Sequence, residues 1–377
     1  MKHVGIYRSV YPVPSETFIT QQAAHLRTYT PTFLVRRRRG ETRFPTFAIS
    51  DGDVYKLKQT FHTLTRSPRL FAAVGSERYD LLHAHFAVDG VYALPLAARL
   101  NIPLVVSVHG YEITSHRRPS WRKGSQTKFQ FVQYMLHERA LKAQATAFIA
   151  ISEYIKRRLL ERGYPEEKIH VHYIGVDLDY FTPASRSARD ARYVLCVGRH
   201  SEKKGIDTLL EAWAVVAQRH PSVSLIQVGA GPLTERVHQL AHEFGVEKQT
   251  RFLGVQPHEE VLRLMRHAEV FCLPSRTAVT GDCEGLGIVF NEASACAVPV
   301  VATRHGGIPE AVMDRETGLL VPEGDAPALA QALDAVLADR ALGERLGRRG
   351  REYVCERFDV RRQGAKLEAL YDAAVAQ

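Results

Sequence analysis

The chain has 377 residues, more than one hydrophobic core usually accommodates and a natural length for two domains. Hydrophobic residues make up 45% and charged residues 24% of it, which excludes a disordered, collagen-like or coiled-coil protein. The net charge of +9 is unevenly distributed. Residues 1–185 carry 26 Lys and Arg against 15 Asp and Glu, and residues 186–377 carry 24 against 26. The first half is therefore basic and the second is nearly neutral.

All five cysteines lie in the second half, and none forms a C-x-x-C pair. This pattern indicates reduced thiols and argues against a disulfide framework or a cysteine zinc site. The first residues lack the apolar core of a signal peptide, and no run of about 18 uninterrupted apolar residues occurs. We therefore expect a cytoplasmic protein, with peripheral contact to the inner face of a membrane as an open alternative.

Short apolar runs alternate with helical patterns in the first half. The predicted strands are 4–7, 33–35, 80–86, 104–110, 147–152 and 169–175, and the predicted helices are 16–26, 88–99, 127–142 and 153–161. The helical stretches repeat apolar residues at three- and four-residue spacing. Repeated strand-then-helix order predicts parallel strands joined by helical crossovers, which is a doubly wound α/β sheet.

The same pattern restarts after an irregular stretch at 182–192. The predicted strands of the second half are 192–198, 224–229, 251–254, 269–274, 298–303 and 318–321. We expect a first domain at 1–183, a linker at 184–191, a second domain at 192–357 and a helix at 358–377 that returns to the first domain. Two Rossmann-like domains of this kind bind ligands in a cleft at the carboxyl ends of their strands.

Four consecutive arginines, Arg36 to Arg39, follow a predicted strand, so we expect them in a loop at the carboxyl end of the first sheet. Together with the basic stretch 117–123, where Trp121 could lie at a lipid interface, they favour an anionic acceptor or an anionic membrane as partner. A solvated loop is the plainer interpretation. A nucleic-acid-binding module is a further alternative, but no helix-turn-helix, zinc or RNA-recognition pattern accompanies the charge, so we expect no nucleic acid partner.

The densest functional pattern lies at 280–312. Gly285 and Gly287 bracket the start of a predicted helix, whose unpaired N–H groups favour an anion. Glu284 and Glu292 lie eight residues apart, a rise of about 12 Å if all the steps were helical. At that distance the two carboxyl groups cannot share one proton. The spacing suits two carboxylates that accept hydrogen bonds from hydroxyls at opposite ends of a nucleotide sugar.

The motif E-G-L-G-I-V-F-N-E at 284–292 resembles the glutamate-x7-glutamate motif of the retaining glycosyltransferases of family 4, which have the GT-B fold. Other segments are similar to the same family: 299–310, 195–212, 108–112 and 174–177. The segments P-S-E-T-F-I at 14–19 and H-A-H-F at 83–86 resemble the branch that assembles exopolysaccharides and other glycoconjugates. One departure is Ala297, where the family usually has glycine.

The resemblance implies that the domain at 1–183 binds the acceptor and that the domain at 192–357 binds the nucleotide-sugar donor. It also implies roles for individual residues. It assigns Arg199 and Lys204 to the donor diphosphate, and their position on a loop that enters a helix fits such a pair of cations. It makes His109 a catalytic group near the transferred sugar. The remaining assignments are Glu284 as a further catalytic residue, Gly285, Leu286, Gly287 and Glu292 as donor-binding residues, and Ser15, Glu16 and His85 on the acceptor side.

No metal is expected in this site. His83 and His85 lie two residues apart on one predicted strand, and we expect them to face opposite sides, which argues against a shared metal ion. The aspartate pairs at 51–53 and 177–179 lie outside the context of a metal site. We therefore expect no cofactor beyond a nucleotide-sugar co-substrate.

The favoured function is retaining transfer of a hexose from a nucleotide diphosphate sugar, with a UDP-sugar as the favoured donor, to the hydroxyl of a glycan, a lipid-linked sugar or a small molecule. No carboxylate is evident for a covalent intermediate, so same-face substitution is expected. The alternatives are a soluble glycosyltransferase for small natural products, the nucleic-acid-binding module and a sugar phosphorylase, whose pyridoxal lysine context is missing.

Overall fold

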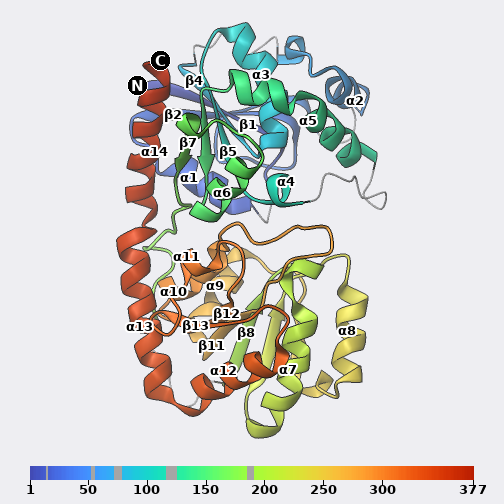
Figure 1. Ribbon diagram of the computed structural model, residues 1–377, viewed down its shortest axis with the longest axis vertical. Helices are drawn as coiled ribbons and strands as arrows, with labels where there is room; N and C mark the ends of the chain where they lie inside the picture. Colours follow the sequence, from blue (N-terminus) through green and yellow to red (C-terminus); the bar gives the residue numbers. More distant parts are fainter. Residues whose placement is uncertain (14–15, 52–55, 72–78, 116–124, 185–190) are drawn as a thin grey trace. The chain divides into compact units, whose positions relative to one another are not determined.

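The computed structural model describes residues 1–13, 16–51, 56–71, 79–115, 125–184 and 191–377. The chain forms two compact units, one made of residues 1–175 with 360–377 and the other of residues 176–359 (Figure 1). Each unit contains one parallel β-sheet with helices around it. The expected linker at 184–191 falls almost wholly outside the described residues.

The first unit contains a seven-stranded sheet in the order β3-β2-β1-β4-β5-β6-β7. Its strands are β1 (Lys2–Tyr11), β2 (Tyr29–Arg38), β3 (Thr46–Asp51), β4 (Leu81–His85), β5 (Leu104–Val108), β6 (Ala147–Ala150) and β7 (Ile169–Val171). Its helices are α1 (Thr17–Ala24), α2 (Lys56–Thr65), α3 (Ala87–Leu100), α4 (Tyr111–Thr114), α5 (Ser125–Gln144), α6 (Glu153–Glu161) and α14 (Val360–Val375). All residues of β4, β5 and β6 are buried, as the apolar runs in the sequence indicate.

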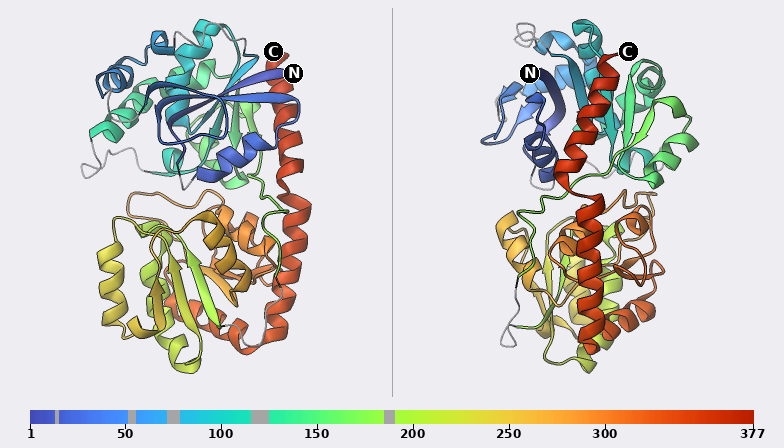
Figure 2. Two further views of the ribbon diagram at one scale, coloured as in Figure 1. Left: turned by 180° about the vertical axis from the view of Figure 1, so that it is seen from behind. Right: turned by 90° about the vertical axis from the view of Figure 1, so that its left-hand side faces the viewer.

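The carboxy-terminal helix α14 belongs to the first unit, as the sequence predicts. Leu367 and Tyr371 lie in the same apolar core as Val4 and Phe33. The buried carboxylate of Glu368 accepts hydrogen bonds from three successive backbone N–H groups at residues 27–29, at 2.6–3.2 Å. Figure 2 shows the helix beside the strands of this unit. Both apolar packing and hydrogen bonding therefore hold α14 to the first sheet.

The second unit contains a six-stranded sheet in the order β10-β9-β8-β11-β12-β13. Its strands are β8 (Tyr193–Val197), β9 (Ser224–Val228), β10 (Thr250–Phe252), β11 (Val270–Leu273), β12 (Val300–Thr303) and β13 (Gly318–Val321). Its helices are α7 (Ile206–Arg219), α8 (Thr234–Glu243), α9 (His258–His267), α10 (Ile288–Ala295), α11 (Ile308–Ala311), α12 (Ala326–Ala338) and α13 (Arg340–Arg357). The six strands overlap the six predicted ones.

Both sheets reverse their strand order once. In the first sheet the chain proceeds outward from β1 to β3 and then restarts at β4 on the other side of β1. In the second sheet it proceeds from β8 to β10 and restarts at β11 beside β8. Loops leaving two neighbouring strands in opposite directions open a crevice, and α/β sheets bind ligands at such points. The fold therefore directs attention to the loops after β1, β4, β8 and β11.

The prediction that the arginine run forms a loop is wrong. Arg36 and its next two neighbours lie within β2, because β2 pairs on both sides, with Tyr11 of β1 and Asp51 of β3 opposite Arg38. Their charge suggested that the strand ends before these arginines, but pairing with a strand on each side keeps them in the sheet. The Arg36 side chain is buried and donates a hydrogen bond to the Thr63 hydroxyl at 3.1 Å. The second basic stretch, 117–123 with Trp121, lies outside the described residues.

Ala297, which departs from the family pattern, has a φ of 57°, in the left-handed region that favours glycine. We predict that Ala297→Gly raises the free energy of unfolding by about 1 kcal/mol, because a side chain no longer opposes this backbone conformation. Urea denaturation followed by circular dichroism measures the change. The matched control is Ala295→Gly within α10, which should lower stability by a similar amount. Destabilisation by both substitutions would contradict the proposed strain.

Candidate active site

The loops after β8 and β11 bring a lysine and a glutamate together at the switch point of the second sheet. The Lys204 Nζ atom lies 2.5 Å from Glu284 Oε2, and the two side chains are only 16% and 13% exposed. Gly205, which follows Lys204, has a φ of 61°, and a Cβ there would overlap the carbonyl oxygen of Pro274. A glycine at this position therefore lets the two loops approach closely.

Positive charge keeps the Glu284 carboxylate ionised. Burial raises the pKa of Glu284, but Lys204 and then Lys203 oppose that effect and bring its pKa down to about 2. Lys203 is itself 3.2 Å from Asp282. These loops thus hold two lysines against two carboxylates, in the pairs Lys203–Asp282 and Lys204–Glu284.

A second loop, after β12, holds the Glu284 backbone in place. The Glu284 N–H donates to His305 Nε2 at 3.2 Å, and its carbonyl accepts from the Gly307 N–H at 3.0 Å. Gly306 has a φ of 54°, and a Cβ there would overlap the Glu284 carbonyl oxygen. The other ring nitrogen of His305 lies 3.1 Å from Glu323. Sequence reasoning did not select His305, although the H-G-G triplet lies inside the segment that resembles the family.

Arg199 lies on the loop after β8, but its position differs from that of Lys204. Its side chain is exposed, and in the described part of the chain its guanidinium has no hydrogen-bond or ion-pair partner. The structure therefore brings Lys204 to Glu284 and leaves Arg199 at the surface of the same loop.

The residues Gly285, Leu286 and Gly287 lead into α10. Gly287 has a φ of 79° and occupies the N-cap, where no side chain caps the helix. The backbone N–H groups and the dipole of this helix end favour negative charge. The start of α10 therefore has no side-chain cap, and anion binding there stays a prediction.

Glu292 lies one helical turn into α10, and its environment differs from that of Glu284. Burial raises its pKa from 4.5 to about 7. Its nearest basic group is the His258 ring, whose Nε2 is 4.0 Å away and which stacks on Tyr180 with ring centroids 5.2 Å apart. Burial lowers the pKa of His258, so this ring is a poor counter-charge. Glu284 thus keeps its charge down to low pH, whereas Glu292 has a pKa close to neutral pH.

Three histidines gather at the carboxyl edge of the first sheet. The His85 Nδ1 and His109 Nε2 atoms are 3.1 Å apart, and His83 bonds Ser107 and Tyr371 at 2.8 and 2.6 Å. The expectation that His83 and His85 face opposite sides is wrong. Their ring centroids are 4.3 Å apart, because residues two apart on a strand share a face.

These histidines are neutral. Burial lowers the pKa of His83 to about 3 and the pKa of His109 well below its usual value, and Arg8 and His83 lower that of His109 further. In the contact between His85 and His109, one ring nitrogen must carry the hydrogen and the other must accept it. The tautomer of one ring therefore fixes the tautomer of the other. The buried carboxylate of Glu112 accepts from the N–H groups of His109 and Gly110 at 2.9 and 3.1 Å, which fixes the backbone of this loop.

A buried cation, Arg8, occupies the switch point of the first sheet. Its guanidinium bonds Asp89 on α3 and Glu16, the latter at 2.6 Å, and lies 4.5 Å from the centroid of the Phe86 ring. Asp89 also accepts from the Ser9 N–H at 2.8 Å. Of the predicted acceptor-side residues, Glu16 and His85 therefore lie at this edge, and Ser15 lies outside the described residues. Arg8 and Asp89, 81 positions apart, left no local pattern in the sequence.

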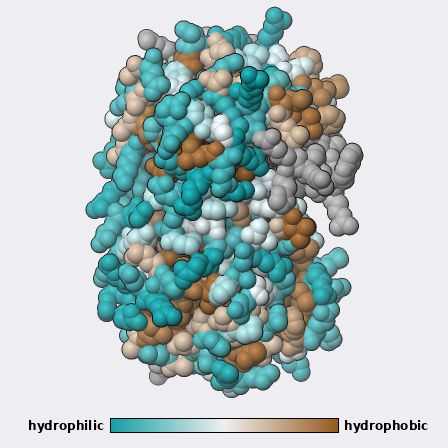
Figure 3. Space-filling view, in the orientation of Figure 1, coloured by the Kyte–Doolittle hydropathy of each residue, from teal (hydrophilic) through white to brown (hydrophobic). Residues whose placement is uncertain are grey.

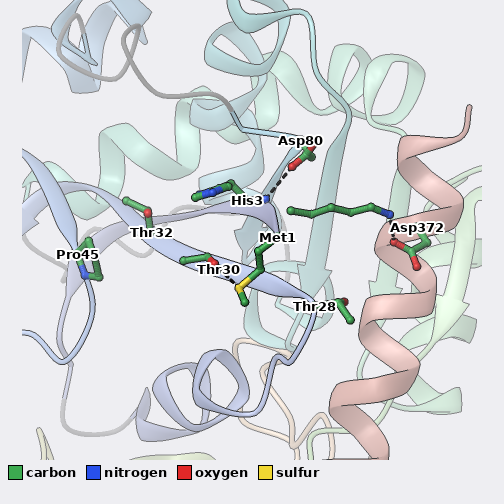
Figure 4. Close-up of a pocket in the computed structure, with 9 residues that line it drawn as sticks. Met1, His3, Thr28, Thr30, Thr32, Pro45, Asp80 and Asp372 are labelled. Carbon is green, nitrogen blue, oxygen red and sulfur yellow. Dashed lines mark hydrogen bonds and ion pairs between the residues drawn. The ribbon is translucent and has the colours of Figure 1, made fainter.

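An open pocket of about 950 Å³ lies elsewhere in the first unit (Figure 4). It is lined by Met1, Lys2, His3, Thr28, Thr30, Thr32, Pro45, Asp80 and Asp372. These residues surround the amino-terminal ends of β1 and β2, whereas ligands of parallel α/β sheets bind at the carboxyl ends. The pocket therefore lies at the opposite end of the strands from the end where such sheets bind ligands.

Within the described ranges, no group of three or more His, Cys, Asp or Glu side chains could hold a metal ion. Asp177, from one of the aspartate pairs, accepts from the N–H groups of Asp179 and Tyr180 at 3.0 and 3.1 Å and so stabilises a turn. The helices of the described chain include none that is long and apolar enough to cross a membrane.

Two units, each with a Rossmann-like parallel sheet, form the GT-B architecture of glycosyltransferases. Residues 16–180 match the family described as Glycosyltransferase Family 4, and residues 181–353 match Glycosyl transferases group 1. A GDP-mannose-dependent alpha-(1-6)-phosphatidylinositol monomannoside mannosyltransferase of Mycolicibacterium smegmatis is 33% identical over 78% of this chain and 76% of its own length. The chain belongs to glycosyltransferase family 4.

A second relative and two solved structures are also similar to this chain. The putative colanic acid biosynthesis glycosyltransferase WcaL of Escherichia coli is 33% identical over 68% of this chain and 61% of its own length. Among solved structures, the sucrose-phosphate synthase of Thermosynechococcus elongatus has a TM-score of 0.81 at 25% identity, covering all of both chains. Anabaena HepE in complex with UDP and glucose has a TM-score of 0.76 at 21% identity, covering 99% of this chain and all of its own, which supports the fold alone.

The raised pKa of Glu292 predicts a pH-dependent stability. Between pH 4.5 and about 7 the unfolded carboxyl loses its proton while the folded one keeps it, so the folded state binds more protons and stability falls as pH rises. The contribution is complete below pH 4.5, is lost by about pH 7 and amounts to at most about 3 kcal/mol.

Urea denaturation of the wild type and of Glu292→Gln across this range measures the effect. The variant should gain stability relative to the wild type as pH rises, because its amide does not titrate. The exposed control Glu235→Gln should keep the wild-type pH dependence. Parallel curves for the wild type and Glu292→Gln would contradict the buried, protonated state.

Proposed function

We propose that this protein transfers a hexose from a nucleoside diphosphate hexose to an acceptor hydroxyl, with retention of configuration at the anomeric carbon. The observation that carries the proposal is the pairing of Lys204 with Glu284 at the switch point of the second sheet, beside the uncapped start of α10. Cations, helix N–H groups and a carboxylate thus lie close together. In a sugar diphosphate, the phosphate oxygens would accept from the first two and the sugar hydroxyls would donate to the third.

The diphosphate is the group that requires positive charge. We assign it to Lys204, to the exposed Arg199 and to the N–H groups at the start of α10, because charge builds on the leaving phosphate as the sugar departs. Arg199 gives a two-pronged donor on an exposed side chain, and Lys204 gives a point charge that is paired with Glu284. Because these groups already supply positive charge, we propose that turnover needs no metal ion.

The two glutamates suit the sugar rings at the two ends of the donor. Glu284 is ionised and accepts hydrogen bonds, so we assign it to hydroxyls of the transferred hexose, next to the diphosphate that Lys204 holds. Glu292 lies along α10, and we assign it to the ribose hydroxyls. Hydroxyl donors would favour its ionised form, so donor binding should release a proton near pH 7.

The reaction we propose is a same-face substitution. The bond between the anomeric carbon and the diphosphate oxygen breaks, and the pair of electrons leaves with the diphosphate. The acceptor oxygen bonds to the same face of the anomeric carbon, and its proton passes to the departing phosphate oxygen. We assign the neutral His109 to a hydrogen bond with the transferred sugar, and Ser15, Glu16 and His85 to the acceptor side.

The names of the relatives bear on the acceptor and on the nucleoside of the donor. The names of the relatives refer to a phosphatidylinositol mannoside and to colanic acid, so we propose a glycan or lipid-linked sugar as acceptor. The sequence favoured a UDP-sugar as donor. The mannosyltransferases, 33% and 37% identical, are described as GDP-mannose-dependent, so we now propose GDP-mannose. A soluble small-molecule acceptor is the competing hypothesis.

A thermal-shift panel tests the donor. Ligand that binds the folded state raises the melting temperature, so GDP and GDP-mannose should stabilise the protein more than UDP, ADP or their sugar conjugates. A larger shift with UDP-glucose or UDP would reject the guanosine assignment and keep the original uridine one. No shift with any nucleoside diphosphate would reject the donor site itself.

Substitutions at the charged pair test its role in turnover, measured as release of nucleoside diphosphate with the donor that the panel selects. Lys204→Ala, Arg199→Ala and Glu284→Ala should each lower turnover at least ~100-fold. The double variant of Lys204 and Glu284 should lose less than the product of the single losses, because each single change leaves its partner unpaired.

Lys248→Ala is the matched control, since that lysine lies on a surface turn of the same unit at 247–249 and is exposed. It should keep wild-type turnover. Wild-type turnover in Lys204→Ala and Glu284→Ala, with unchanged melting temperatures, would overturn the assignment.

Chelation with EDTA should leave the wild-type rate unchanged, and a loss restored by added divalent metal would overturn the metal-free proposal.

A further inference from the structure

One carboxylate of the second unit joins the loops after β11, β12 and β13. Glu323, on the loop after β13, accepts a hydrogen bond at 2.6 Å from the N–H of Thr277, which follows β11. The same carboxylate contacts His305, which follows β12, with its Oε2 atom 3.1 Å from the Nδ1 atom of the ring. Because the three strands are neighbours in the sheet, Glu323 ties together the loops at adjacent carboxyl ends.

The His305 ring is buried although it is polar on two sides. Hydrophilic residues cover much of the face of the protein seen in Figure 3, where water can satisfy their polar groups. The His305 side chain differs, because it is only 3% exposed. Its two ring nitrogens therefore need partners inside the protein. Nδ1 has Glu323, and Nε2 accepts from the N–H of Glu284 at 3.2 Å.

These two partners decide which ring nitrogen of His305 carries the hydrogen. A backbone N–H can only donate, so Nε2 must present its lone pair to Glu284. A carboxylate can only accept, so Nδ1 must carry the hydrogen toward Glu323. The opposite tautomer would place two donors together at Glu284 and two acceptors together at Glu323. Glu323 therefore selects the tautomer that can hold Glu284.

His305 and its neighbour Gly307 hold the Glu284 backbone on both sides of its Cα atom. His305 accepts from the N–H, and the Gly307 N–H donates to the carbonyl at 3.0 Å. Two fixed peptide groups fix the direction of the bond between Cα and Cβ. They thereby limit where the Glu284 carboxylate can lie.

We propose that His305 and Glu323 are positioning residues of the donor site. Glu323 selects the tautomer of His305, and His305 holds the Glu284 backbone so that the carboxylate is directed to the hexose of the donor. Neither residue contacts the donor. This inference rests on the proposed function, in which Glu284 binds the hexose, and it gives a role to two residues that have none in that proposal.

The charged groups around His305 give the arrangement a pH dependence. Burial lowers the pKa of His305 most, Glu323 and Glu284 raise it, and Lys203 and Lys204 lower it, with a net shift below its usual value of 6.5. The ring is therefore neutral at neutral pH. Protonation in acid would put a hydrogen on Nε2, where it would face the Glu284 N–H. Acid should therefore release the Glu284 backbone from His305.

Isothermal titration calorimetry of the full chain tests the proposal with two probes. They are GDP and GDP-mannose, or UDP and UDP-glucose if the thermal-shift panel selects uridine. His305→Phe keeps the size of the ring but leaves the Glu284 N–H unpaired, so affinity for the sugar conjugate should fall ~10-fold. Affinity for the nucleoside diphosphate alone should not change, because Glu284 is assigned to the hexose and not to the diphosphate.

His305→Gln is the conservative variant, because its amide oxygen can accept from the Glu284 N–H and does not take up a proton. It should recover most of the affinity that His305→Phe loses. The ratio of its affinity for the sugar conjugate to that of the wild type should rise as pH falls below 6.5. Glu292 titrates in both proteins, so its contribution cancels in this ratio.

Glu323→Ala tests the carboxylate by itself. Without Glu323 the ring can adopt either tautomer, so affinity for the sugar conjugate should fall by a smaller factor than in His305→Phe. Because the Glu323 side chain is 44% exposed, this variant also serves if His305→Phe does not fold. Wild-type affinity of Glu323→Ala for the sugar conjugate would overturn the role of the carboxylate.

His220 and Asp334 provide the matched control, as a second histidine and carboxylate pair of the same unit. His220 Nε2 lies 2.8 Å from Asp334 Oδ1, and the histidine side chain is 14% exposed. This pair joins the end of α7 to α12 and includes no residue of the loops at the site. His220→Phe should bind both probes like the wild type.

The outcomes separate this inference from the proposed function. A wild type that binds neither probe would reject the proposed function, and this inference with it. If the wild type binds both probes, wild-type affinities in His305→Phe would reject this inference alone. An equal loss for both probes in His305→Phe would also reject it, because the residue would then be merely structural. Nitrogen NMR of the ligand-free protein that places the His305 hydrogen on Nε2 would overturn the tautomer assignment whatever the donor.

Discussion

The contact between Lys204 and Glu284 is the interaction on which the proposed donor site depends. The two residues are 80 positions apart, and they meet because β8 and β11 are neighbours at the point where the strand order reverses. Glycines at 205 and 306 permit the surrounding loops to approach without overlap. The strand order, the loop backbone and the charges thus produce one arrangement, which places a cation and an ionised carboxylate beside the start of α10.

The two units solve the problem of buried charge differently. In the second unit, Lys203 and Lys204 are paired with carboxylates at the edge of the sheet, and we propose that a diphosphate ligand exchanges those pairs for its own. In the first unit, Arg8 is buried between Asp89 and Glu16, while the adjacent histidines are kept neutral by burial. A neutral His109 can donate or accept one hydrogen bond without introducing a charge. These differences suit a charged donor on one unit and an uncharged hydroxyl acceptor on the other.

Much of the fold follows from the sequence, because fully buried parallel strands are continuous apolar runs. The exceptions have physical causes. β3 and α2 were not predicted, and α2 turns its apolar residues outward. The arginine run was predicted as a loop, but Arg36 lies in a strand that pairs on both sides. At the site, the glutamates and the basic loop were found from spacing and resemblance. The direct Lys204–Glu284 contact, the support from His305 and the Arg8–Asp89 pair join distant positions, and no local pattern reports them.

The most direct test of the central claim is a crystal structure of the protein with a bound nucleoside diphosphate sugar. We expect the diphosphate to lie at the start of α10, with Lys204 Nζ within hydrogen-bond distance of a phosphate oxygen. We also expect Glu284 to accept a hydrogen bond from a hydroxyl of the hexose. Density for the compound at another place, with the Lys204–Glu284 contact intact and Arg199 directed to solvent, would contradict it.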